Sequence, residues 1–303
     1  MSVPYFDAHC DTVTRFHSLR SAGTHLDLNR MELCFEPRAQ VFALWAYPGL
    51  DRPFTLRRLM SRLERELARN DDILTLCRSA EEIRAAACGG RTAALIGVEG
   101  ASLLRCSVAE LTEAYRRGVR VVTLCWNRDN LLCGSAMDSG SGLTRAGENF
   151  AAACWNLGVA VDLSHASEKT FWDVLHIAKR PVFCSHSNAK DVCGHPRNLT
   201  DAQITALIEN GGCMGLNLCP DFVGGSRDMD ALYAHIDHVL SLGGSGCLCL
   251  GGDLDGVDRL PAGFTGVESM ADFHEYLLRR GLSGQLLRDI YWNNLMRFME
   301  EAL

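Results

Sequence analysis

Eight short apolar runs, separated by helical patterns, constrain the fold of this chain more than any other feature. They are rich in β-branched and aliphatic residues, lack strict alternation, and often begin after Gly or Pro. Strands buried on both faces of a parallel sheet have this character. The runs are Pro4–Asp7, Ala39–Ala46, Thr92–Val98, Arg120–Cys125, Val159–Leu163, Pro181–Cys184, Cys213–Leu218 and Cys247–Leu250.

Amphipathic segments fill the gaps between these runs. Ser79 with Glu82, and Thr200 with Gln203, have the spacing of capping boxes, and Gly211 is placed to end the second of these helices. Another helix is indicated by apolar residues at helical spacing, namely Leu56, Leu59, Met60, Leu63 and Leu67. Further helices are predicted over Thr144–Leu157, Glu168–Ala178, Met229–Leu242, Ser269–Arg280 and Ser283–Ala302.

The alternation of eight strands with helices predicts an α/β fold with a parallel sheet. Eight is also the number of strands that closes into a (β/α)8 TIM barrel, which is the predicted architecture. A doubly wound open sheet is the alternative, although neither glycine-rich nucleotide-binding motif follows a strand. The 303 residues contain no repeat or obvious linker, so we expect a single domain over residues 1–303.

Composition narrows the function classes. With 47% hydrophobic and 22% charged residues, the chain is neither disordered nor collagen-like. A net charge of −7 with scattered Lys and Arg argues against a nucleic-acid or anionic-membrane partner. No apolar run approaches the roughly 20 residues of a membrane helix. The first residues, MSVPYFDAHCDT, lack the features of a secretory signal, so we expect a cytoplasmic protein.

The fourteen cysteines do not indicate a disulfide scaffold. Most of them lie within apolar runs, where Cys behaves as a small buried hydrophobe, and no C-x-x-C pair occurs. These observations favour a reducing compartment. The clearest examples within apolar runs are Cys125, Cys184, Cys213, Cys247 and Cys249.

Polar side chains follow five of the predicted strands, at the point where each strand ends. In a barrel the carboxyl ends of the strands converge on one mouth, where active sites are built. We therefore expect residues far apart in the sequence to meet in space, although each motif alone is a weak signal. The polar residues are His9 and Asp11, Glu99, His165, His186 and Asp253.

Three histidines and three carboxylates form a nitrogen and oxygen ligand set that suits Zn²⁺ or a similar divalent ion. His9 and Asp11 are two residues apart, so their side chains point to the same side of a strand and can coordinate one ion. Glu99 has two carboxylate oxygens and can bridge two ions. His165 and His186 can hold the second ion. Two metals roughly 3.5–4 Å apart can share a hydroxide and polarise a substrate oxygen, which leaves Asp253 as a proton shuttle.

Three more residues are candidates for substrate binding. Arg197, in a loop after the sixth run, has the guanidinium shape that holds a carboxylate in bidentate fashion; a structural salt bridge at a helix start is the alternative. Trp126 and Asn127 end the fourth run and are expected to line the same mouth, although Trp126 would also suit packing at the barrel rim.

The motifs resemble the membrane (renal-type) dipeptidase family, peptidase family M19, among the amidohydrolase-like barrels. The resemblance spans nearly the whole chain and includes WNNLMRFME near the end. The matching stretches are DAHCDT at 7–12, IGVEGA at 96–101, VDLSHAS at 161–167, PVFCSHSNAKDVCGHPRNLTD at 181–201 and GGDLDGV at 251–257.

The resemblance implies the same roles as the chemistry. The zinc ligands of the family fall on His9 and Asp11, on Glu99 as the bridge, and on His165 and His186. The acid/base aspartate of the family falls on Asp253, and the arginine that binds the substrate carboxylate falls on Arg197. One departure is Trp126, which stands where renal-type enzymes carry a substrate-contacting histidine; its indole N–H or Asn127 is then the expected oxyanion donor.

The sequence therefore predicts a zinc-dependent dipeptidase that uses two divalent ions and a metal-bridging hydroxide. The resemblance suggests tolerance of a D-residue at the second position. One alternative is another binuclear amidohydrolase, such as an amidase, lactonase or deacylase. Another is a metal-binding barrel without catalysis. Homodimers are common among such barrels, so a second copy of the chain is the partner to look for besides the dipeptide.

Overall fold

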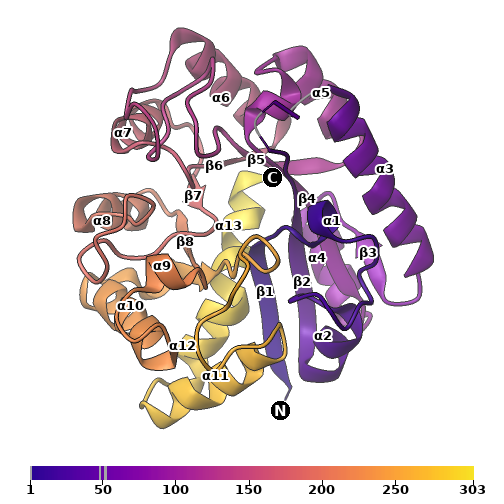
Figure 1. The fold of residues 1–303 in the computed structure, drawn as a ribbon, viewed down its shortest axis with the longest axis vertical. Coiled ribbons are helices and arrows are strands. Elements are labelled where there is room, and N and C mark those ends of the chain that lie inside the picture. Colours follow the sequence, from indigo (N-terminus) through magenta and orange to yellow (C-terminus); the bar gives the residue numbers. More distant parts are fainter. Residues whose placement is uncertain (1, 48, 51–52) are drawn as a thin grey trace.

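In the computed structural model, which describes residues 2–47, 49–50 and 53–303, parallel strands close into a barrel surrounded by helices (Figure 1). The strand order is β2-β1-β9-β8-β7-β6-β5-β4, and β2 pairs with β4 to close the ring. The predicted (β/α)8 barrel is thus confirmed, and this closure excludes the open doubly wound sheet. The strands are β1 Val3–Cys10, β2 Phe35–Leu44, β4 Thr92–Glu99, β5 Val119–Thr123, β6 Ala160–Asp162, β7 Phe183–Cys184, β8 Cys213–Leu216 and β9 Leu248–Leu250.

One further strand, β3 at Leu74–Leu76, was not expected from the sequence. It pairs with the first residues of β4, beside the part of the same edge that β5 occupies. Three residues are too few to show a periodic pattern, so the sequence carries no signal for this strand. It lies outside the closed ring of eight.

Helices follow the strands, and their termini agree with the capping signals. Thr200 and Gln203 form the complete capping box, and Gly211 follows the helix with a φ of +74°. At Ser79 only half of a box forms, because the Glu82 carboxylate accepts from Arg78 N instead. The helices are α1 Thr12–Arg15, α2 Leu28–Cys34, α3 Pro53–Arg69, α4 Ala80–Cys88, α5 Val108–Arg116, α6 Arg145–Leu157, α7 Glu168–Ile177, α8 Asp201–Glu209, α9 Pro220–Val223, α10 Met229–Ser241, α11 Ser269–Arg279, α12 Gly284–Arg288 and α13 Asn294–Ala302.

The barrel interior is apolar at one end and polar at the other. Alternation along β4 turns Ala93 and Leu95 into the interior, and the same alternation carries Glu99 to the inner face where the strand ends. The other strands contribute small or aromatic side chains to the apolar layer, including Phe6, Ala39, Val41, Val121, Ala160, Phe183 and Cys249. A separate, larger core fills the space between the strands and the outer helices.

The C-terminal helix closes the apolar end of the barrel. The ring of Phe298 on α13 packs against that of Phe183 with a centroid separation of 4.5 Å, and the ring centroids of Trp292 and Phe6 are 5.5 Å apart. Residues Asp289–Asn293 form a π-helical segment between α12 and α13, so the single helix predicted over Ser283–Ala302 is interrupted. With one end filled by side chains, the polar end is where a small molecule can enter.

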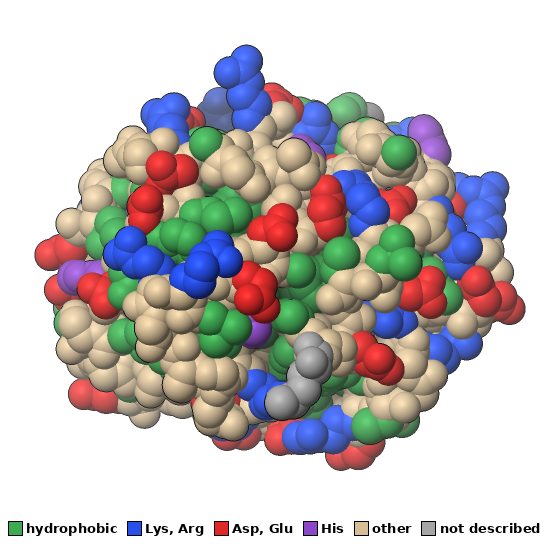
Figure 2. All heavy atoms as spheres, turned by 90° about the horizontal axis from the view of Figure 1, so that it is seen from below, with side chains coloured by type: hydrophobic (Ala, Val, Ile, Leu, Met, Phe, Trp, Pro, Cys, Tyr) green, Lys and Arg blue, Asp and Glu red, His purple; other side chains and the backbone are tan. Residues whose placement is uncertain are grey.

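The surface carries both signs of charge. On the face drawn in Figure 2, acidic and basic side chains are interspersed. Among the described residues, no helix combines the length and hydropathy required to cross a bilayer. Cys125, Cys184, Cys213, Cys247 and Cys249 are buried and unbridged, as expected for thiols in apolar strands.

Candidate metal centre and substrate pocket

The six predicted residues meet at the polar end of the barrel. His9 lies near the end of β1 and Asp11 follows that strand, whereas Glu99 is the last residue of β4. The other three lie in the loops that follow β6, β7 and β9, namely His165, His186 and Asp253. All six are buried or nearly so, although they come from five different strands.

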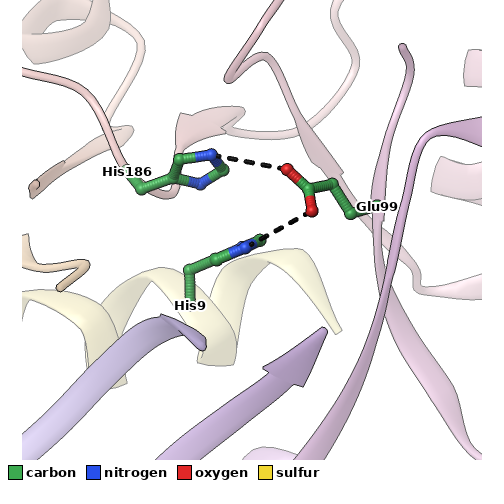
Figure 3. A group of neighbouring side chains, drawn as sticks. All are labelled: His9, Glu99 and His186. Carbon is green, nitrogen blue, oxygen red and sulfur yellow. Dashed lines mark ion pairs between the residues drawn. The ribbon is translucent and has the colours of Figure 1, made fainter. Parts of the chain in front are cut away.

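Glu99 lies between the histidines and directs its two oxygens to different partners (Figure 3). Its Oε2 is 3.6 Å from Nε2 of His9. Its Oε1 is 2.8 Å from Nε2 of His165 and 3.6 Å from Nε2 of His186. One carboxylate thus faces two groups of nitrogen atoms, which is the arrangement required of a bridging ligand.

His9 also faces the two aspartates. Its Nε2 lies 3.8 Å from Oδ1 of Asp11 and 3.9 Å from Oδ1 of Asp253. Asp253 has a positive φ of 54°, and His165 has a positive φ of 70°. Residues other than glycine rarely adopt this conformation, and such strain is concentrated at functional sites.

Hydrogen bonds behind two of the rings define which nitrogen faces the centre. Asn127 Oδ1 lies 2.7 Å from Nδ1 of His165, so this nitrogen carries the proton. Ser185 Oγ donates to Asp162 at 2.7 Å and lies 2.7 Å from Nδ1 of His186, from which it accepts. In both rings Nε2 is therefore the unprotonated nitrogen that a metal ion requires.

These bonds leave electron pairs facing one another. Nε2 of His165 lies 2.9 Å from Nε2 of His186, although neither nitrogen carries a proton in this assignment, and it lies 2.8 Å from a Glu99 oxygen. Among the described residues, His9 Nε2, Asp11 Oδ1 and Glu99 Oε2 are buried without a hydrogen-bond partner. A cation at the centre would satisfy these facing nitrogen and oxygen atoms, so the residues fit a divalent metal centre.

Burial shifts the protonation of this cluster. It lowers the pKa of His9 to about 4, and it also lowers the pKa values of His165 and His186, so the rings are neutral at pH 7. Burial and mutual repulsion raise the pKa values of Asp11 and Glu99. Burial raises the pKa of Asp253 to about 7, against the opposing effect of Arg197.

A cavity of about 270 Å³ opens onto this cluster. Arg197, from the loop between β7 and α8, lines it and is only 3% exposed. Its guanidinium lies 5.4 Å over the ring of Phe222, and its Nη2 donates to the His186 carbonyl at 3.3 Å. Nε of Arg197 is buried without a partner among the described residues, so the cation retains capacity for an anion.

Trp126 and Asn127 also line the cavity, after β5. Trp45 and Tyr47, which follow β2, form another part of its lining and were not selected from the sequence. The predicted strand includes Trp45 and ends at Ala46. In the structure β2 ends at Leu44, so Trp45 lies beyond the strand, at the mouth of the barrel. Aromatic residues at the ends of predicted strands are the signal that would have identified them.

A model of the membrane dipeptidase family, peptidase family M19, matches residues 1–303 of this chain. An uncharacterized dipeptidase of Schizosaccharomyces pombe is 35% identical over 210 residues, which are 67% of this chain and 51% of that protein. The chain thus spans about half the length of this relative.

Two solved structures share the fold. The dipeptidase AC, described as a metallopeptidase of family M19, has a TM-score of 0.92 and 25% identity, covering 100% of this chain and 99% of that chain. A metallopeptidase from Rhodobacter sphaeroides, liganded with a phosphinate mimic of the dipeptide L-Ala-D-Ala, has a TM-score of 0.92 and 24% identity and covers both chains fully. Because the family model matches from the first residue to the last, the chain belongs to the membrane dipeptidase family, peptidase family M19.

Proposed function

We propose that this protein is a zinc-dependent dipeptidase, built as a single domain over residues 1–303, that hydrolyses the peptide bond of dipeptides. The observation that carries the proposal is the juxtaposition of two sites. The buried nitrogen and oxygen cluster around Glu99 and the buried cation of Arg197 line the same cavity of about 270 Å³. The first suits divalent ions and the second suits a carboxylate.

In this proposal Glu99 would bridge two ions, of which His9 and Asp11 would hold one and His165 and His186 the other. A nitrogen-rich set of neutral imidazoles and carboxylates favours Zn²⁺ over Mg²⁺ or Ca²⁺, which prefer oxygen ligands alone. When bound, such ions supply Lewis acidity, which polarises a carbonyl group and makes water nucleophilic near neutral pH. Asn127 and Ser185 hold two of the rings in the tautomer that binds metal.

Asp253 is the proposed proton carrier. Burial raises its pKa to about 7 in the cluster without metal, and from this position the carboxylate can take up a proton from the attacking water and release it to the leaving amine. Asn217 Nδ2 lies 3.4 Å from Oδ2 of Asp253 and orients that oxygen. Oδ1 faces His9, so the carboxylate lies against the metal cluster.

Arg197 is the proposed anchor for the C-terminal carboxylate of the substrate. A planar guanidinium pairs with a carboxylate through two hydrogen bonds and so fixes its orientation as well as its charge. Because the anchor and the cluster share one small cavity, a peptide with further residues before the carboxylate would place the wrong bond at the cluster. This geometry favours dipeptides over longer peptides.

Trp126 and Asn127 are the remaining proposed substrate-binding residues. The side-chain oxygen of Asn127 accepts from His165, so the side-chain nitrogen, Nδ2, is the atom left to donate to a substrate oxygen. The Trp126 ring lies 6.2 Å from the His165 ring, at the position where renal-type enzymes carry a histidine. Its indole N–H is the other proposed donor to charge that develops on the carbonyl oxygen.

The test is hydrolysis of a dipeptide panel before and after chelation, with metal content measured in the same samples. The panel contains L-L and L-D pairs, because the Rhodobacter sphaeroides protein was solved with a mimic of L-Ala-D-Ala. We expect about two zinc equivalents, activity that is lost on chelation, and recovery when zinc is added. Two bound metals without turnover of any dipeptide would overturn the activity and favour another amidohydrolase or a binding protein.

A further inference from the structure

Three aromatic side chains form a continuous wall on one side of the cavity. The ring of Trp45 lies 4.4 Å from that of Tyr47 and 5.0 Å from that of Trp126. All three line the cavity that contains Glu99 and Arg197. Trp45 is 8% exposed and Tyr47 is 63% exposed, so the wall has a fixed base and an accessible edge. We call Trp45, Tyr47 and Trp126 the aromatic wall.

The strand order places Trp45 and Tyr47, two members of this wall, across the barrel from Arg197, and Trp126 after β5 lies between them and Arg197 in the ring order. Trp45 follows β2, and Arg197 lies in the loop after β7. In the closed ring β2 and β7 are four strands apart in either direction, which is the largest separation that eight strands allow. Glu99 on β4, His9 on β1 and His165 after β6 come from strands between these two in the ring, and His186 follows β7 itself.

This separation indicates which side of the cavity each end of a bound dipeptide occupies. A dipeptide with its carboxylate on Arg197 and its peptide bond at the cluster extends its first residue toward the opposite side of the mouth. We propose that the aromatic wall binds the side chain of this first residue, and that the protein prefers dipeptides with a large apolar or aromatic first residue. The inference rests on the proposed function, because it requires Arg197 to hold the carboxylate.

There is room for a large side chain beside the wall. A second cavity of about 480 Å³ shares Arg15, Trp45 and Tyr47 with the first one. Leu59 and Phe54 contribute apolar surface to its lining. A substrate side chain that extends past Tyr47 would therefore be transferred from water onto aromatic and aliphatic surface. Such transfer is the source of affinity in an apolar pocket.

The charged groups near the wall are mostly engaged. Arg15 donates to the Asp255 carbonyl at 3.1 Å and to Asp258 at 2.9 Å. Arg62 donates to the carbonyls of Val13 and Thr14, both at 2.9 Å. Their charges are thus offset by local partners, whereas Arg58 is exposed at the second cavity. A preference for an acidic first residue is consequently the competing outcome in the test.

The experiment compares kcat/KM of the zinc-loaded protein for Phe-Ala, Leu-Ala, Glu-Ala and Gly-Ala. Burying a large apolar side chain should raise kcat/KM for Phe-Ala and Leu-Ala about tenfold or more over Gly-Ala. Tyr47→Ala should lower the Phe-Ala to Gly-Ala ratio several-fold, and Tyr47→Phe, which keeps the ring, should preserve it. Tyr47 is exposed, so its replacement should leave the fold intact. The matched control is Trp172→Ala, an aromatic residue of α7 that is 38% exposed and lies outside the lining of this cavity.

The outcomes separate this inference from the proposed function. Equal kcat/KM for all four dipeptides, a preference for Glu-Ala, or a ratio unaltered by Tyr47→Ala would each overturn the role of the aromatic wall while leaving the dipeptidase in place. Failure of the zinc-loaded protein to hydrolyse any dipeptide would overturn the proposed function, and this inference with it.

Discussion

Asn127 Oδ1 lies 2.7 Å from Nδ1 of His165, and this contact directs the other ring nitrogen to Glu99. Loss of the acceptor would free the ring to change tautomer and orientation. We expect Asn127→Ala to weaken metal binding about 10- to 100-fold. Competition with a chelator of known affinity measures this directly, and Asn149→Ala, on the exposed face of α6, is the control. Unchanged metal affinity in Asn127→Ala would show that the contact does not position the ring.

Asp253 lies near the cluster, but its proposed task is proton transfer. Asp253→Asn keeps the size of the side chain and removes the base, so kcat should fall roughly 10²- to 10⁴-fold. Metal content should remain at about two equivalents. Steady-state kinetics and elemental analysis of the same sample check both statements. Loss of one metal equivalent would instead identify Asp253 as a metal ligand. This is the competing interpretation, because Oδ1 of Asp253 lies only 3.9 Å from Nε2 of His9.

Metal affinity should depend on pH in a defined direction. Burial and mutual repulsion raise the pKa values of the proposed ligands Asp11 and Glu99 in the folded protein. Below these values the carboxyl groups are protonated, and an entering cation must displace the protons. Affinity should therefore rise with pH while these two groups titrate, by about tenfold per unit for each proton released.

Calorimetric titration with zinc in buffers of different ionisation enthalpy counts those protons. Near pH 6 the protons released should come from the ligand carboxyl groups of Asp11 and Glu99, whose pKa values are raised. Because burial also lowers the pKa of His9 to about 4, that ring is already neutral there and contributes little to the count. An affinity that is independent of pH between about pH 5 and pH 7 would contradict the assignment.

Arg197 is only 3% exposed and lies among the carboxylates of the cavity. Arg197→Ala should lower kcat/KM for dipeptides about 100-fold or more, because a buried charge pair with the substrate is lost. A dipeptide amide, which lacks the carboxylate, should be affected far less. Arg227→Ala, an exposed arginine paired with Asp221, is the control. An equal loss on both substrates would point to a structural role for Arg197.

Close strand packing at the mouth gives a prediction about stability. A Cβ at Gly215 would lie 1.8 Å from the backbone oxygen of Ser185. Gly215→Ala should therefore destabilise the fold by about 3 kcal/mol or more. Gly194→Ala, where a Cβ meets nothing within 4 Å, should have little effect. Chemical denaturation of the two variants gives the comparison, and similar midpoints would contradict it.

The sequence predicted most of the architecture because buried parallel strands have a strong local signature. It predicted the convergence of His9, Glu99 and His186 because strand ends in a barrel share one mouth. What it missed depends on contacts between distant segments. The short strand β3 has three residues and exists through its pairing with β4. Trp45 and Tyr47 join the cavity because the pairing of β2 with β4 closes the ring and brings the end of β2 to the common mouth.

The hydrogen bonds that support His165 and His186 could not be predicted from the sequence, because they also join distant segments. Asp162 acts on the His186 ring through Ser185, and nothing in the local sequence indicates that these two side chains from neighbouring strands meet. Asn127 was selected as a lining residue, but its contact with His165 joins the ends of β5 and β6. Such positioning roles become visible only when the strand order and register are known.

The most direct test of the proposed centre is anomalous diffraction at the zinc edge from crystals of the zinc-loaded protein. We expect two peaks on either side of the Glu99 carboxylate, one contacting His9 and Asp11 and the other contacting His165 and His186. A single peak, or peaks that leave Glu99 on the outside, would contradict the bridging arrangement and the mechanism built on it.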